Sequence, residues 1–142
     1  MKYSVKQYLE QWAEACPSDR ALRAATEQEI LDAEGILGFQ LPDDYKYFLS
    51  MFGGGMIGSN PVIGLGSTKD MSIHEADMHA AMSFYYEPWM GSKVLVISVD
   101  GLGNTWLLSC SGVGFADHEE QRVNHKYSTF SQWLEQHCFG MA

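Results

Sequence analysis

The sequence predicts an α+β domain in which one twisted, mostly antiparallel sheet is packed by flanking helices. Three features of the 142 residues support this class. Apolar residues recur with helical spacing in the first half, a β-branched run with tight turns follows in the second half, and another helical pattern comes near the end. The length suits a single domain, which we place at residues 1–142.

Two helices are expected before residue 40. The first covers residues 4–16, with Ser4 as its N-cap and Pro17 after its end. The second begins with a capping box, because Thr26 is followed three residues later by Glu29, and it ends at Gly38. The expected apolar faces consist of Val5, Tyr8, Leu9, Trp12, Ala13 and Cys16 in the first helix and of Ile30, Ala33, Ile36 and Leu37 in the second.

The stretch Leu41–Gly55 predicts the short helix around which the other elements pack. Pro42 suits the first helical position, where a missing N–H group costs nothing. Asp43 and Asp44 place negative charge at the positive end of the helix dipole, and a glycine run ends the helix. We expect a structural role for Leu41, Pro42, Tyr45, Phe48, Leu49, Phe52, Gly53 and Gly54.

Residues 56–92 combine glycine-punctuated strands with one helix. Two short strands, at residues 56–57 and 62–63, are expected around a turn at residues 59–61. Ser72 and Glu75 form another capping-box pattern, which predicts a helix from residue 72 to about residue 84. Pro88 then ends any helical segment.

The second half turns to strand. The nearly continuous β-branched run Val94–Val99 is typical of a central strand. Residues 100–104 form a turn, residues 105–109 return as the partner strand, and a third strand at residues 114–116 runs into the acidic segment 117–120. Ser128 is expected to cap a last helix, whose apolar face consists of Phe130, Trp133, Leu134 and His137.

The composition argues against several classes of function. The formal net charge is −9, from 18 acidic and 9 basic side chains, which disfavours direct binding to nucleic acid. The sequence has no apolar signal core and no run long enough to span a bilayer, so we expect a cytoplasmic protein without membrane association. Cys16, Cys110 and Cys138 lack CxxC spacing and are expected to be reduced thiols.

No catalytic motif is recognisable. His74, Glu75 and His79 give HExxxH spacing, and five residues of helix rotate the second ring by about 140° onto another face. His118 lies in the acidic segment 117–120, but an extended segment would divide these side chains between the two sides of the sheet. We therefore predict no catalytic residue, metal or cofactor, with a small hydrolase using the His118 region as the enzymatic alternative.

The order of these motifs resembles the SUKH superfamily. That superfamily groups fungal cell-wall synthesis regulators with bacterial immunity proteins that neutralise toxins. The similarity covers about residues 26–134, and residues 56–92 carry little of the pattern. It consists of a helix ending in Leu-Gly at residues 37–38, the LP-acid-acid-Tyr-Lys helix with its Gly-Gly run, the strand–turn–strand at residues 94–109, the acidic stretch at residues 115–119 and the helix at residues 128–134.

This resemblance implies a non-catalytic domain that binds another protein. The domain would be an immunity protein for a basic toxin such as a nuclease, or a regulatory scaffold like the fungal members. A monomer or weak homodimer is expected. An acidic surface would steer a basic partner, although the charge could instead serve solubility and the aromatic residues could cover the sheet. The candidate contacts are Tyr85, Tyr86, Trp89, Asp100, Asp117, Glu119 and Glu120.

Overall fold

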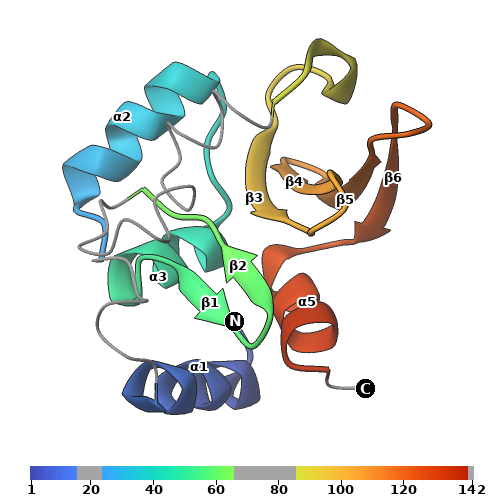
Figure 1. Cartoon of the computed structure of the whole chain (residues 1–142). Coiled ribbons are helices and arrows are strands. Elements are labelled where there is room, and N and C mark those ends of the chain that lie inside the picture. The colour runs from blue at the N-terminus through green and yellow to red at the C-terminus, as the bar shows by residue number, and fades with distance from the viewer. Residues whose placement is uncertain (16–23, 66–85, 141–142) are drawn as a thin grey trace.

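The computed structural model describes residues 1–15, 24–65 and 86–140 (Figure 1). The helix predicted from residue 72, with His74 and His79, and the candidate contact Tyr85 lie outside the described residues. The described elements are α1 (Tyr3–Ala15), α2 (Glu27–Leu37), α3 (Asp43–Met51), β1 (Gly55–Ile57), β2 (Asn60–Val62), the 3-10 helix η2 (Pro88–Met90), β3 (Leu95–Val99), β4 (Thr105–Ser109), β5 (Gly112–Asp117), β6 (Arg122–Tyr127), α5 (Phe130–Trp133) and the π-helical segment η3 (Leu134–Cys138).

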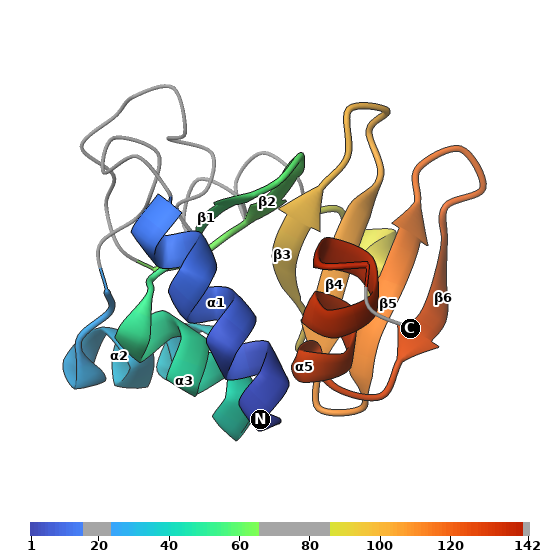
Figure 2. The same ribbon diagram turned by 90° about the horizontal axis from the view of Figure 1, so that it is seen from below.

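The architecture has the predicted α+β class. Strands β3 to β6 form a four-stranded antiparallel sheet in chain order, and β1 pairs with β2 in a separate hairpin. Figure 2 shows α5 lying across one face of the sheet, with α1, α2 and α3 on the side of the hairpin. The Ile63 N–H group donates to the Ile97 carbonyl at 2.8 Å, which attaches the hairpin segment to the outer edge of β3.

The sheet separates two apolar clusters. Alternate side chains of β3 and β4 enter the larger cluster, together with the helices, and the side chains between them enter a smaller cluster on the other face. The run Val94–Val99 is therefore apolar because both of its faces are covered. Its predicted position at the centre of the sheet is wrong, since β3 is the first strand in the sheet order.

The sequence does not predict β6. Its side chains are mostly polar and exposed, so alternation gives no apolar face to recognise. The predicted extended conformation of the acidic segment is also wrong. Only Asp117 belongs to β5, and residues 118–121 form the turn into β6.

Several residues of the helices differ from their predicted positions. Ile36 is 66% exposed and Tyr8 is 44% exposed, although the helical spacing predicts both on apolar faces. In the last turn of α2, Leu37 packs against the core as predicted, but its neighbour Ile36 does not. Pro42 is the N-cap of α3 and not its first helical residue. The cap of α5 is Thr129 and not Ser128.

Helix α3 carries the centre of the larger cluster. Tyr45, Phe48 and Leu49 have no exposed surface, as the helical spacing predicts. The Phe48 ring lies 5.5 Å from the Phe130 ring and 6.3 Å from the Trp12 ring, so it contacts both α5 and α1. Burying such a ring contributes about 3 kcal/mol. Gly53, with φ of +84°, ends the helix as its N–H group donates to the Phe48 carbonyl.

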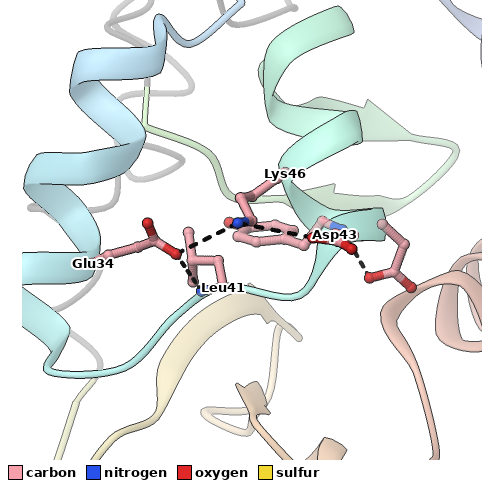
Figure 3. Close-up of polar contacts among 6 residues, drawn as sticks. Glu34, Leu41, Asp43 and Lys46 are labelled. Carbon is pink, nitrogen blue, oxygen red and sulfur yellow. Dashed lines mark hydrogen bonds and ion pairs between the residues drawn. The ribbon is translucent and has the colours of Figure 1, made fainter.

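The carboxylate of Glu34 joins α2 to α3, as Figure 3 shows. It accepts a hydrogen bond of 2.7 Å from the Leu41 N–H group and lies 3.8 Å from the ammonium of Lys46. Lys46 also lies 3.8 Å from Asp43 in its own helix. Because the Glu34 side chain is 14% exposed, water screens this pair less than an open surface pair. The contact fixes where the chain enters α3.

Two further polar contacts fix α3, one against α5 and one against the segment that follows β2. An oxygen of Asp44 accepts hydrogen bonds from the N–H and hydroxyl groups of Ser131, both at 2.8 Å. The Tyr45 hydroxyl donates to the Ile63 carbonyl at 2.8 Å, and burial raises the pKa of that hydroxyl far above its usual value.

Among the described helices, none is long and apolar enough to cross a membrane.

Replacing Phe48 by alanine should lower the free energy of unfolding by about 3–5 kcal/mol, because the change removes a buried ring and leaves a cavity. The control is Tyr3→Ala, since Tyr3 is 76% exposed and the change should stay within about 0.5 kcal/mol. Urea unfolding followed by circular dichroism measures both. Equal midpoints for the two variants would show that α3 is not the centre of the core.

Candidate binding surface

Three turns meet at one end of the sheet, which we call the loop end (Figure 2). They are the β1–β2 turn (residues 58–59), the β3–β4 turn (residues 100–104) and the β5–β6 turn (residues 118–121). In an antiparallel meander, alternate connections project from the same end. The Asn104 side-chain oxygen accepts a hydrogen bond of 2.9 Å from the His118 N–H group, which ties the second turn to the third. Asp100 and the acidic segment 117–120 are thereby brought together.

The Asp100 carboxylate shapes the β3–β4 turn. It accepts hydrogen bonds from the N–H groups of Leu102 and Asn104, at 2.8 and 2.9 Å, and from the Asn104 amide at 3.0 Å. Partial burial raises the pKa of Asp100, but the hydrogen bonds from Asn104 and Leu102 outweigh it and leave the pKa below its usual value. The group is therefore charged at neutral pH and holds the turn.

The acidic residues of the β5–β6 turn differ in how freely they can meet a partner. One Asp117 oxygen accepts from the N–H groups of Glu119 and Glu120, at 2.9 and 3.0 Å, so Asp117 holds the turn as Asp100 does. Glu120 forms an exposed ion pair of 2.8 Å with Arg122. Within the described part of the chain, the Glu119 carboxylate has neither a hydrogen bond nor an ion pair.

Leu102 is an apolar residue at this surface that sequence reasoning missed. It lies in the tip of the β3–β4 turn and is 81% exposed. Single exposed apolar side chains are common on proteins, so its position matters more than its exposure. Because Asp100 fixes the turn that carries it, Leu102 is presented in one place beside the negative charges. Its signal in the sequence is a leucine between two turn glycines, at residues 101–103.

A hollow of about 550 Å³ opens between the β1–β2 and β3–β4 turns and η3. Aromatic rings from β4, β5 and η3 line it together with the Asp100 carboxylate. Sequence reasoning assigned His137 to a helix face and did not place it beside these turns. The lining consists of Ser59, Asn60, Pro61, Val99, Asp100, Gly101, Trp106, Phe115 and His137.

The aromatic candidates at the start of the second half lie elsewhere. Tyr86 and Trp89 are half-buried against the smaller cluster, on the sheet face that α5 does not cover. The Tyr86 hydroxyl donates to the Gly91 carbonyl at 2.6 Å, and the Trp89 indole N–H donates to Glu87 at 2.5 Å. These rings therefore pack against the sheet, as the alternative interpretation expected, and leave part of their surface open.

The residues considered for chemistry are dispersed. Within residues 1–15, 24–65 and 86–140, no group of three or more His, Cys, Asp or Glu side chains is placed to hold a metal ion. The His118 side chain is exposed in its turn, and Cys110 is exposed at the other end of the sheet. Burial raises the pKa of the Cys138 thiol, which disfavours the nucleophilic thiolate. The loop end thus offers charge, an apolar tip and a hollow, which suit binding.

Comparison with known proteins finds one matching family and a solved structure of similar fold. The profile of a family described as SMI1-KNR4 cell-wall (SUKH_5) matches residues 1–139. A crystal structure of a protein from Pseudomonas syringae pv. tomato has a similar fold, with a TM-score of 0.71 and 16% sequence identity. The similarity covers 94% of this chain and 97% of that one. No curated protein matches the chain.

Replacing Asp100 by alanine should lower the free energy of unfolding by about 1–2 kcal/mol, because the turn loses three hydrogen bonds to a charged acceptor that is partly exposed to water. Glu119→Ala is the matched control, and its effect should stay within about 0.5 kcal/mol. Urea titrations of both variants measure this difference. Two equal curves would contradict the structural role given to Asp100.

Stability should fall as the pH drops below about 6.5, the usual pKa of histidine. Burial lowers the pKa of His137 in the folded protein, so at these pH values the unfolded chain binds more protons than the folded one. His137→Gln should make unfolding less sensitive to pH between 5 and 7. Thermal melts across this range provide the test, and an unchanged pH dependence in the variant would refute it.

Proposed function

Because the chain belongs to the SMI1-KNR4 cell-wall family (SUKH_5), we propose that it is a non-catalytic binding protein that neutralises a cognate toxin, as an immunity protein. The observation that carries the proposal is the loop end, where a hydrogen bond joins the acidic β3–β4 and β5–β6 turns and Leu102 is exposed in the first of them. Interfaces draw most of their binding energy from a few anchoring side chains within a polar rim. Leu102 and the hollow supply the anchors, and the acidic turns supply the rim.

The charge of the protein supports a basic partner. The net charge of −9 gives a long-range field that attracts cationic surfaces, and the acidic loop end directs the encounter. A toxin that acts on nucleic acid binds phosphate through cationic side chains. An inhibitor with the opposite charge would associate rapidly with such a surface and cover it. We therefore propose a basic toxin, such as a nuclease, as the partner.

The family description supports a second candidate function. It names the cell wall, which favours a regulatory or scaffold module that binds a protein of the same cell. Both functions require a binding surface and no catalytic group, so the loop end serves either one. The identity of the partner distinguishes them. A toxin gene beside this gene favours immunity, whereas recovery of regulatory proteins with the tagged chain favours the scaffold.

The immunity proposal is tested by the association rate with the toxin encoded beside this gene, measured by stopped flow at two salt concentrations. Charges at this surface are screened over about 8–10 Å at physiological salt. Raising the salt concentration should therefore slow association much more than it changes dissociation. A salt-independent association rate would contradict electrostatic steering. If the toxin does not bind, the scaffold function replaces the immunity function.

Charge reversal locates the surface. Replacing both Glu119 and Glu120 by lysine should slow association with the toxin about tenfold, which is the lower end of what electrostatic steering contributes. Asp117 is retained because it holds the turn. Glu10→Lys with Glu14→Lys on α1 changes the net charge equally at two exposed positions. The association rate of this control variant should be much closer to that of the unchanged protein. Equal slowing by both pairs would show that only net charge matters.

A further inference from the structure

The hollow at the loop end combines aromatic rings and one carboxylate with uncharged residues. Trp106, Phe115 and His137 contribute aromatic rings, and Asp100 contributes a negative charge. None of the described residues that line it is lysine or arginine. A negatively charged aromatic hollow without an internal cation is complementary to a positive group from outside.

The rings are held in place before any ligand arrives. Trp106 is 9% exposed, and its centroid lies 5.0 Å from Phe115 and 4.6 Å from His137. His137 in turn stacks on the buried Trp133 at 5.7 Å, with an angle of 22° between the ring planes. Binding therefore requires little ordering of the site, which favours affinity. Burial also lowers the pKa of His137, which keeps this ring uncharged at neutral pH.

The Asp100 carboxylate has one lone-pair position that the turn does not use and that a ligand can fill. A carboxylate has about four lone-pair positions, and the turn uses three of them. The same hydrogen bonds fix the direction of the carboxylate, and its lowered pKa keeps it charged. A donor that enters the hollow thus meets a fixed negative charge in a wall that also contains aromatic rings.

From this geometry we propose that the hollow binds the guanidinium group of an arginine side chain presented by the partner protein. Guanidinium is planar, stacks on aromatic rings and is more weakly hydrated than an ammonium group, so it suits aromatic walls better than lysine does. The inference rests on the proposed function for the protein that presents the arginine. The chemistry of the hollow can be tested without that protein.

The probe is N-acetyl-arginine-N-methylamide, titrated into the ¹⁵N-labelled protein while the Trp106 indole signal is followed by NMR. The shift should saturate at millimolar probe. The matched citrulline amide has nearly the same shape without the charge and should bind about fivefold or more weakly, because it lacks the cation–π attraction and the ion pair. Equal affinities for the two amides, or no shift of the indole signal, would overturn the proposal.

Three variants locate the binding. Asp100→Asn and His137→Leu should each weaken the arginine amide several-fold, and Glu119→Gln should not, because Glu119 does not line the hollow. The ¹H–¹⁵N spectrum reports whether each variant is folded. If Asp100→Asn is unfolded, the affinity of His137→Leu for the arginine amide provides the test. Unchanged binding in His137→Leu, or equal loss in Glu119→Gln, contradicts the proposal.

The outcome with the toxin is separate. If the toxin binds and the arginine amide does not, the hollow is not an arginine site while the immunity function stands. If the amide binds in the hollow and no toxin binds, only the immunity function fails. If His137→Leu lowers the affinity for the toxin, and Glu10→Lys with Glu14→Lys does not, the toxin binds through the same hollow as the arginine amide.

Discussion

Burial of the aromatic face of α3 is the constraint on which the described parts of the structure depend. Phe48 contacts Trp12 of α1 and Phe130 of α5, and the Tyr45 ring lies 4.8 Å from Phe130. The Tyr45 hydroxyl also bonds to Ile63, whose N–H group binds β3. One short helix therefore joins the N-terminal helices, the hairpin and the sheet. A polar contact from Glu34 (Figure 3) and hydrogen bonds accepted by Asp44 fix its direction.

This arrangement explains why the candidate surface lies on turns. The helices pack against the sheet and the hairpin, and the turns at the loop end project from the ends of the strands (Figure 2). Asp100 and Asp117 each hold a turn through their own side chains, so two of the acidic residues act mainly in local structure. Glu119 and Leu102 face outward at this surface, and Asp100 keeps one lone-pair position for the proposed arginine. The same charges thus give the surface both its shape and its electrostatic field.

The sequence predicts those parts of the fold whose causes are local. The capping box of Thr26 and Glu29 and the apolar face of α3 are read from neighbours a few residues apart, and both are present. Strand β6 is missed because an exposed edge strand has no apolar alternation. Ile36 is misplaced because periodicity does not show which turn of a helix leaves the core.

The candidate site is predicted less completely, for the same reason. The acidic turns in the sequence indicate Asp100 and Glu119 as candidates, but the proximity of these turns results from sheet topology. The hollow combines Asn60, Trp106 and His137 from distant parts of the chain, so no local pattern indicates it. To predict Leu102 as a contact residue from the sequence, one would have to know that its turn is exposed.

We infer that a partner binds at the loop end. The most direct test of this inference is the footprint of the toxin encoded beside this gene on the labelled chain, measured by hydrogen exchange and NMR cross-saturation. We expect protection at residues 100–104 and 118–121 and saturation transfer to the Leu102 methyl groups. A footprint on α1 and α2, with the loop end unprotected, would contradict the account.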